Sequence, residues 1–278
     1  MLAKLLPLIL LAAITKTANG AEQKPWLGRQ VLSRSVRNQP RAGGRVSRRP
    51  IACIRTVQRV NGDALWVGDG WLRTNEVVPL EEAKSWFSAR ILLRPNAFDY
   101  VSRAAAYCAE RDYEAALADC ATALHISPKY DAAYYYRAAA RAAQGQFKEA
   151  VDAYSSALRL NPRLLGAYLD RAAAQLELGD YSSALADIDH VLRFLPHESD
   201  AYYLRGVAQF HLGDYQLALD DLNYVVQATP TRAAAYKLRG ACHQELGEHD
   251  AAFADFEKAD ELEGAAAIAH REDSRQTR

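Results

Sequence analysis

The fold of this chain is decided by a sequence that repeats. Residues 131–164 read DAAYYYRAAARAAQGQFKEAVDAYSSALRLNPRL, and residues 165–198 read LGAYLDRAAAQLELGDYSSALADIDHVLRFLPHE. Both stretches are 34 residues long and share a tyrosine at position 4, an arginine at position 7 and a proline at position 32. A fixed period of this length is typical of proteins in which each unit is one supersecondary element.

The same register runs without insertion from Ala97 to Gly264, so the unit occurs five times. Each unit predicts two helices, because small and large apolar residues recur at spacings of three and four on either side of position 15. Position 15 is glycine in four units, which ends the first helix. The proline at position 32 then ends the second helix. Tyrosine stands at position 4 of every unit, as Tyr100, Tyr134, Tyr168, Tyr202 and Tyr236.

This pattern resembles the tetratricopeptide repeat over residues 97–264, about 60% of the chain. The resemblance implies a mainly α fold, a right-handed α-solenoid of stacked helix pairs. Two positions depart from it: Arg111 replaces the glycine of the first unit, and Gly264 replaces the proline of the last. Within residues 80–96 we expect a helix from Leu80 to Leu93 that covers the first repeat. Within residues 265–278 we expect a short closing helix, because an open end would expose an apolar face.

Residues 1–20 predict a secretory signal. They combine Lys4, an apolar run from Leu5 to Ile14, and small residues before a cleavage site after Gly20. The run is shorter than the roughly 20 residues of a spanning helix, so we expect no transmembrane span. An uncleaved anchor and a buried N-terminal helix are the alternatives. The predicted mature protein begins at Ala21 and is exported, to the periplasm or an extracellular space.

Residues 21–79 predict a small β-rich module. Short runs rich in valine, isoleucine and tryptophan alternate with turn residues, at 26–32, 51–60, 64–67 and 70–78. Asn61-Gly62-Asp63 has the composition of a tight hairpin turn. The stretch LWVGDGW (65–71), followed by Val77-Val78, resembles bacterial Src-homology-3-like domains. That resemblance implies a small β-barrel of a kind that holds peptides or cell-wall fragments.

The same region is strongly basic. Residues 21–60 carry ten basic side chains and one acidic side chain, although the whole chain has 34 of each. One interpretation is a contact between residues 29–59 and an anionic envelope polymer or lipid headgroups; the other is a solvated barrel face with a long loop. The balanced total gives no support for nucleic-acid binding. The arginines are Arg29, Arg34, Arg37, Arg41, Arg45, Arg48, Arg49, Arg55 and Arg59.

Two charged columns run through the repeats. Position 7 is arginine in all five units: Arg103, Arg137, Arg171, Arg205 and Arg239. Position 23 is aspartate in four units (Asp119, Asp187, Asp221 and Asp255), whereas the second unit has Ala153 beside Asp152. Partly buried charges need partners, so the matched columns predict a structural ladder of ion pairs, within or between repeats. A row of ligand-binding arginines is the alternative.

In tetratricopeptide proteins the first helices line a concave groove that usually holds a peptide, and the resemblance places positions 5, 9 and 12 on it. Apolar surface of this kind usually marks a partner site, although another part of the chain or a second copy could fill the groove. The candidate partner-binding residues are Tyr135, Leu169 and Tyr203 at position 5, Ala139, Ala173 and Val207 at position 9, and Phe210 at position 12.

The chain shows no catalytic or metal-binding motif. It has no GxSxG, no P-loop and no GxGxxG. Its four cysteines form no CxxC, and His243, Glu245 and His249 do not form HExxH. We therefore expect a non-catalytic protein-interaction scaffold without cofactor or metal, which binds a peptide or protein. The alternative is a cell-envelope binding protein that acts through the basic module.

Overall fold

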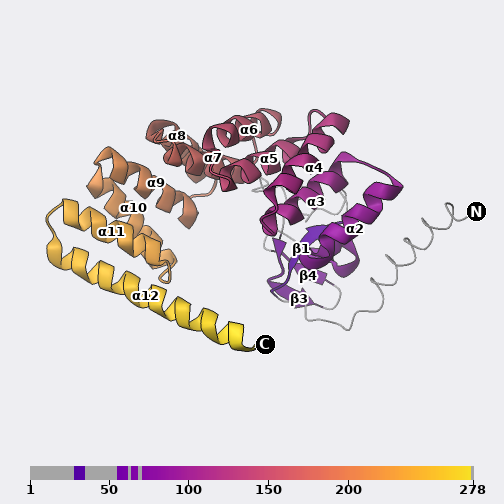
Figure 1. The fold of residues 1–278 in the computed structure, drawn as a ribbon. Helices are drawn as coiled ribbons and strands as arrows, with labels where there is room; N and C mark the ends of the chain where they lie inside the picture. Colours follow the sequence, from indigo (N-terminus) through magenta and orange to yellow (C-terminus); the bar gives the residue numbers. More distant parts are fainter. Residues whose placement is uncertain (1–27, 35–54, 62–63, 68–70, 277–278) are drawn as a thin grey trace, which may run out of the picture. The chain divides into compact units, whose positions relative to one another are not determined.

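The computed structural model describes residues 28–34, 55–61, 64–67 and 71–276 (Figure 1). These residues form a mainly α-helical chain with a small β region on its N-terminal side. They group into two compact units that divide between Ala167 and Tyr168. The predicted leader (residues 1–20), Cys53 and the arginines at 37, 41, 45, 48 and 49 lie outside the described residues.

The β region of the first unit consists of two antiparallel three-stranded sheets. Strand β1 (Gln30–Ser33) lies between β2 (Arg55–Thr56) and β6 (Val77–Pro79). Strand β4 (Ala64–Trp66) lies between β3 (Arg59–Asn61) and β5 (Trp71–Arg73). The β3–β4 register pairs Asn61 with Ala64, on either side of the predicted turn.

Two of the predicted strand runs change sheet part-way, which the sequence pattern did not indicate. The run 51–60 is divided into β2 and β3, and the run 70–78 is divided by a 3-10 helix, η2 (Thr74–Glu76). The Glu76 carboxylate stabilises that corner by accepting a hydrogen bond from the Arg73 amide, at 2.8 Å. Changing sheet lets both sheets contribute to one core. That core consists of Val31, Val57, Leu65, Val67, Leu72 and Val77. Closure into a single barrel is not seen among the described strands.

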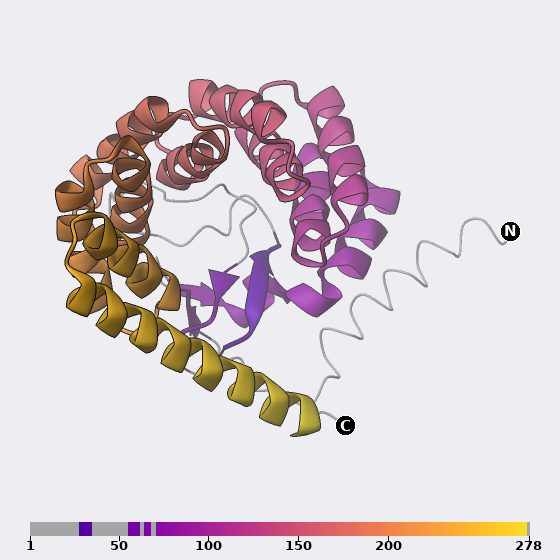
Figure 2. The same ribbon diagram turned by 60° about the vertical axis from the view of Figure 1, so that its left-hand side comes forward.

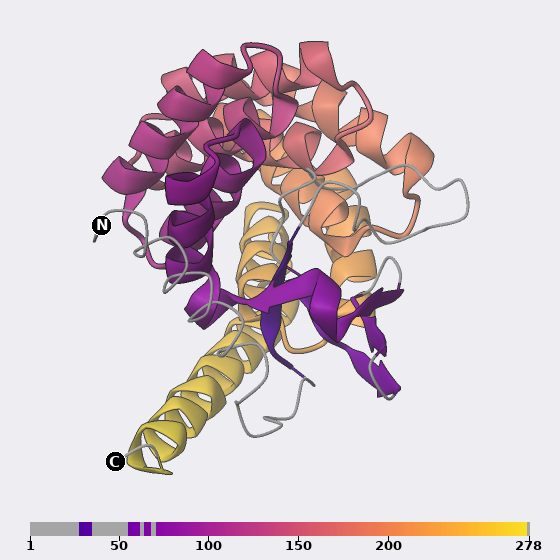
Figure 3. The same cartoon turned by 90° about the vertical axis from the view of Figure 1, so that its right-hand side faces the viewer.

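Helix α2 (Leu80–Leu93) follows β6 directly, in the interval where the sequence predicts a helix (Figure 3). Its Phe87 is fully buried and packs edge-to-face against Phe98 of the first repeat, with ring centroids 6.2 Å apart. Leu32 of β1 and Val78 of β6 belong to the same apolar cluster. The β region, α2 and the first repeat therefore share one core.

Five helix pairs follow at the 34-residue period (Figure 1). Within each compact unit, first helices pack on their own second helix and on the next pair, as the alternating sizes at positions 4, 8 and 20 predict. The pairs are α3 (Ala97–Ala109) with α4 (Tyr113–Ile126), α5 (Asp131–Ala143) with α6 (Phe147–Leu160), α7 (Leu165–Glu177) with α8 (Tyr181–Phe194), α9 (Ser199–Leu212) with α10 (Tyr215–Ala228), and α11 (Ala233–Glu245) with α12 (His249–Gln276).

The turn inside each pair is a left-handed residue at position 15. At Gly145 the φ angle is 74°, its amide donates to Ala142 O, and the next amide donates to Arg141 O, which is a Schellman ending. Arg111 adopts the same conformation in the first repeat, with φ 63°, although it carries a side chain. The backbone of the turn is therefore kept where the glycine is lost.

The C-terminal end differs from the expectation of a separate closing helix after Gly264. Helix α12 runs unbroken from His249 to Gln276, so residues 265–276 extend the last repeat (Figure 2). The second helices of the other repeats end two residues before a proline, as at Ile126 before Pro128. Glycine, unlike proline, keeps its amide hydrogen and does not clash with the preceding turn, so the helix continues through position 32.

Candidate protein-interaction surface

The residues predicted to bind a partner are all partly exposed. In the first unit these are Tyr135 and Ala139 on α5; in the second unit they are Leu169 and Ala173 on α7, and Tyr203, Val207 and Phe210 on α9. We use the name first-helix surface for this set of residues, which forms one group in each unit. It contrasts with position 8 of the same helices, three residues after position 5, where Ala138 and Gly206 are buried.

The first repeat does not contribute to this surface. Val101 at position 5 and Ala105 at position 9 are both 0% exposed. They belong to the cluster that also contains Leu32 and Val78 of the two strands. The positions of the first repeat that correspond to the candidate residues are therefore buried in a core that the repeat shares with the β region and α2, and the partly exposed positions start at the second repeat.

The aromatic members of the surface are held by contacts within the chain, which the sequence pattern alone did not indicate. The Tyr135 ring meets the ring of Tyr154 on α6, with centroids 5.7 Å apart. The guanidinium of Arg232 lies 3.9 Å from the centroid of Tyr203, and Arg232 also pairs with Asp200 at 2.6 Å. Side chains fixed in this way lose little conformational entropy when a partner binds.

The charged columns form two-point ion pairs. In four repeats the arginine at position 7 donates from Nε and Nη2 to the two oxygens of the aspartate at position 23, over 2.6–2.7 Å. The aspartates are only 5–6% exposed. Partners are 16 residues apart, so the pairs lie within repeats. They are Arg103–Asp119, Arg171–Asp187, Arg205–Asp221 and Arg239–Asp255.

Several of these arginines also reach the helix pair before their own. Nη1 of Arg103 donates to Ser88, and Nη1 of Arg239 donates to Asn223, both at 2.9 Å. Nη1 of Arg205 donates to Asp189 at 3.2 Å. Hydrogen bonding to Asp221 raises the pKa of Arg205 above its ordinary value. A buried carboxylate stripped of its partner is costly, so these arginines hold the two helices of a repeat together.

Arg137 is the member of the column without such partners. Position 23 of its repeat is Ala153, which is buried, and position 25 of the preceding repeat is Ala121. Among the described residues its guanidinium makes a cation–π contact, 4.8 Å from the centroid of Tyr134, and no hydrogen bond or ion pair.

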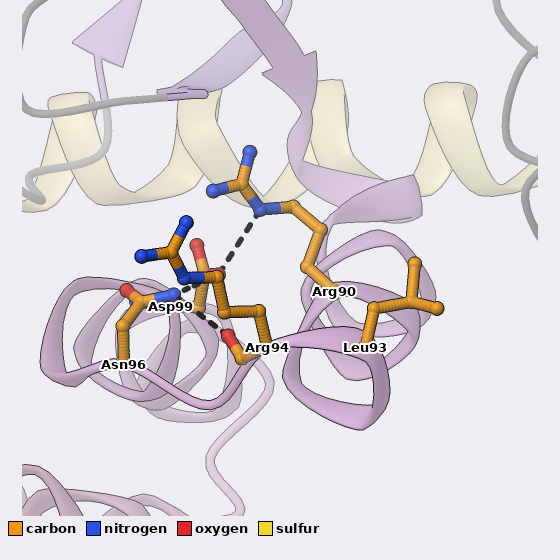
Figure 4. A pocket seen from close by; sticks show the side chains of 5 residues that line it. All are labelled: Arg90, Leu93, Arg94, Asn96 and Asp99. Atoms are coloured by element: carbon orange, nitrogen blue, oxygen red, sulfur yellow. Dashed lines mark hydrogen bonds and ion pairs between the residues drawn. The ribbon is translucent and has the colours of Figure 1, made fainter.

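A small pocket lies where α2 meets α3 (Figure 4). It is lined by Arg90, Leu93, Arg94, Asn96 and Asp99 and has a volume of about 160 Å³. Oδ2 of Asp99 accepts hydrogen bonds from Arg90 Nε at 3.0 Å and from Asn96 Nδ2 at 2.6 Å. The Asn96 side chain in turn caps α3 by accepting from the Asp99 amide, at 3.0 Å. These bonds fasten α2 to the first repeat.

Sequence profiles of the tetratricopeptide repeat family match residues 132–164, 169–233 and 233–265. The repeats within residues 132–265 are tetratricopeptide repeats. This family consists of scaffolds without catalytic activity of their own. The tetratricopeptide profiles, the helix bounds and the 34-residue period agree over the second to fifth repeats, and the first repeat has the same helix pair and turn.

Several solved structures share the fold. YrrB, "a TPR protein with an unusual peptide-binding site", is 20% identical with a TM-score of 0.55, and the match covers 68% of this chain and 97% of YrrB. Residues 41 to the end of MamA from Desulfovibrio magneticus RS-1 are 22% identical with a TM-score of 0.56, covering 61% and 96%. The APC/C hetero-tetramer Cut9–Hcn1 is 18% identical with a TM-score of 0.57, covering 66% and 36%. No curated protein sequence matches the chain.

Within the part of the basic module that the structure describes, most arginines make contacts inside the protein or are buried. Arg29 pairs with Glu81 of α2. Arg34 donates to Val77 O at 2.7 Å and lies 5.5 Å from the centroid of Trp86, and burial lowers its pKa. Arg55 is 7% exposed, whereas Arg59 is exposed. Of these four side chains Arg59 is exposed, Arg29 and Arg34 are partly exposed, and Arg55 is buried.

The cysteine and histidine residues of the repeats form no reactive or metal-binding group among the described residues. Cys108, Cys120 and Cys242 are free thiols. Burial raises the pKa of Cys108 to about 12 and that of Cys242 to about 11. His243 contacts Glu248 at the turn of the last repeat. No helix in the described part of the chain is long and apolar enough to cross a membrane.

Proposed function

We propose that the protein is an exported scaffold whose first-helix surface binds an extended segment of a partner protein. The observation that supports this most directly is the contrast between repeats. Positions 5 and 9 are buried in the first repeat, which shares a core with the β region, and are partly exposed in the second, third and fourth repeats. YrrB, which has a similar fold, is described as having a peptide-binding site.

The chemistry of the surface indicates what it would accept. Ala139 and Ala173 are small, so a peptide backbone could approach the helices closely. The rings of Tyr135 and Tyr203 are fixed in place and offer apolar faces beside them. Aromatic side chains in such settings often dominate binding energy, with about 2 kcal/mol or more lost on truncation. We therefore expect an extended partner segment with apolar or aromatic side chains.

A photo-crosslinking experiment tests the site before the partner is known. A crosslinking amino acid at Leu169 should capture a defined partner from the native host, whereas the same amino acid at Phe253 should not. Phe253 is a matched control because it is 64% exposed and lies on α12, a second helix. Equal capture at both positions, or none at Leu169, would refute the proposal.

Substitutions then separate binding from stability. The double change Tyr135→Ala and Tyr203→Ala should lower partner affinity at least about 30-fold, while Tyr135→Phe and Tyr203→Phe should retain most of it because the rings remain. The alanine variant should also lose some stability, because Tyr154 and Arg232 lose their ring contacts. The circular dichroism spectrum at the binding temperature must therefore be compared for both variants.

Export and the identity of the β region are parts of the same proposal. N-terminal sequencing of the protein from its host should find Ala21 first; an intact Met1 would refute export through a cleaved signal. The two sheets with one shared core support a Src-homology-3-like module. Its alternative role, envelope binding through residues 29–59, predicts that the basic module carries the binding: replacing Arg59 should then weaken pull-down with wall material.

A further inference from the structure

We propose that Arg137 is a binding site for a carboxylate from outside the chain, supplied by an acidic side chain of the partner. The site consists of the Arg137 guanidinium and the Tyr134 ring in the second repeat. It is separate from the first-helix surface, because position 7 faces the second helix of its own repeat, as the four Arg–Asp pairs show.

The other repeats show what this arginine is arranged to hold. At four equivalent positions two guanidinium nitrogens donate to one carboxylate over 2.6–2.7 Å. The tyrosine at position 4 lies under each guanidinium, with centroid distances of 5.2–5.6 Å in those repeats and 4.8 Å for Tyr134. The second repeat therefore keeps the receptor half of the pair and lacks the carboxylate half.

The neighbourhood of Arg137 supplies no substitute acceptor. Ala153 and Ala121 occupy the two places from which the other repeats offer carboxylate, amide or hydroxyl oxygens. Position 26 of the second repeat is Ser156. In the third and fourth repeats this position carries a ring, His190 or Tyr224, that lies against the tyrosine at position 4 with centroids 4.3 Å apart. The Ser156 hydroxyl bonds to Asp152 O and accepts from Arg159, a second cation on α6.

The guanidinium is also accessible and charged. None of its nitrogens is among the buried polar atoms without a partner in the described residues, so solvent reaches them. An arginine keeps its proton at physiological pH. A planar guanidinium with two donors in a fork matches a carboxylate in a two-point arrangement. A phosphate offers similar oxygens, but the four internal precedents are all carboxylates.

The binding site is tested on the full chain by NMR of the arginine Nε–Hε groups during titration with sodium acetate, with sodium chloride as the ionic-strength control. We expect a saturable shift of Arg137 and no comparable shift of Arg103, Arg171, Arg205 or Arg239. Ala153→Asp should remove the response and raise the melting temperature by about 2–4 °C, because it completes the pair. Arg137→Lys removes this Nε–Hε signal and therefore assigns it to Arg137, and the circular dichroism spectrum of the variant should match that of the wild type.

An Arg137 signal that ignores acetate, or that responds as the four paired arginines do, would overturn the site. If Ala153→Asp fails to fold, Ala153→Asn supplies one uncharged acceptor oxygen at the same position and should reduce the response in part. The source of the carboxylate rests on the proposed function: Arg137→Lys should weaken partner capture at Leu169 about tenfold. Unchanged capture with an intact acetate response would overturn the partner's role and leave the first-helix surface unaffected.

Discussion

The second and fourth repeats have helix pairs at matching positions, but the same arginine has different surroundings in each. Arg205 in the fourth repeat donates to both oxygens of Asp221 and to Asp189. Arg137 in the second repeat has two alanines where those acceptors would stand. Both repeats nevertheless keep the same turn and helix ends. The apolar columns and the turn therefore specify the repeat, whereas the ion pair adds stability to a fold that forms without it.

The largest effect should come from breaking a pair in the fourth repeat. Asp221→Ala removes a carboxylate that is 5% exposed and leaves Arg205 with the exposed Asp189, so we expect a loss of about 1–3 kcal/mol of unfolding free energy. Arg137→Ala, the matched change in the second repeat, should cost less than about 0.5 kcal/mol. Urea unfolding followed by circular dichroism measures both free energies. Equal losses would contradict the expectation that the ion pair stabilises the fourth repeat more than Arg137 stabilises the second.

The pH dependence of that difference is a second check. Hydrogen bonding to Asp221 raises the pKa of Arg205 above its ordinary value. A raised pKa contributes stability below the ordinary value and loses it only as the pH rises through the raised one. The gap between wild type and Asp221→Ala should therefore be constant from about pH 7 to 10. If the difference in unfolding free energy between the two proteins disappears in this range, the charge of Arg205 does not stabilise the pair.

Position 8 offers a comparison between the fourth and fifth repeats, which have glycine where the others have alanine. A Cβ on Gly240 would lie 2.9 Å from Phe256 Cε1, whereas on Gly206 its nearest neighbour would be Leu222 Cγ at 3.2 Å. We expect Gly240→Ala to lose about 1–2 kcal/mol through overpacking. Gly206→Ala should change stability by less than about 0.5 kcal/mol, because improved helix propensity offsets the tighter contact. Melting temperatures that rank the two variants in the opposite order would refute this.

Position 15 separates the first repeat from the others. Arg111 adopts a left-handed conformation with φ 63°, which side chains disfavour. Arg111→Gly should therefore stabilise the protein by about 0.5–1 kcal/mol, partly offset by the greater freedom of glycine in the unfolded chain. The reverse change, Gly145→Arg, should destabilise it by a similar amount. Urea midpoints measure both changes in stability. A lower midpoint for Arg111→Gly would show that the arginine side chain itself stabilises the turn.

Position 32 gives the smallest expected effect on stability. Gly264→Pro should end α12 near Leu262 and remove the helical signal of residues 265–276, as in the repeats that carry the proline. Gly264 and Ala265 are exposed, so the urea midpoint should move little. Gly264→Ala is the control and should keep the helix. Unchanged helicity in the proline variant, or a large fall in the midpoint, would mean that the extension packs on the repeats.

Local signals explain what the sequence predicted. The glycine and proline columns act within a few residues, so they predict the helix pairs from Ala97, and the apolar spacing within residues 80–93 predicts the helix from Leu80 to Leu93. Positions 7 and 23 are also symmetric about the turn at position 15, a signal that could have placed the ion pairs within repeats. Long-range contacts have no comparable local pattern in the sequence. The strands that change sheet, the burial of Val101 and Ala105, and the Arg232 contact with Tyr203 all depend on segments brought together by tertiary packing.

The closure of each Arg–Asp pair inside its own repeat bears on how such an array can grow or shrink. Because both partners lie 16 residues apart around one turn, duplication or deletion of a 34-residue block carries the pair along intact. Only the Nη1 contact to the neighbouring block, such as Arg239 to Asn223, is exchanged for another. An insertion between positions 7 and 23 of one block would instead separate a buried carboxylate from its cation. Changes in repeat number are therefore expected to preserve the ion pairs when whole units are added or lost. The second repeat differs, because Ala153 stands at position 23 and the repeat has no Arg–Asp pair of its own at positions 7 and 23.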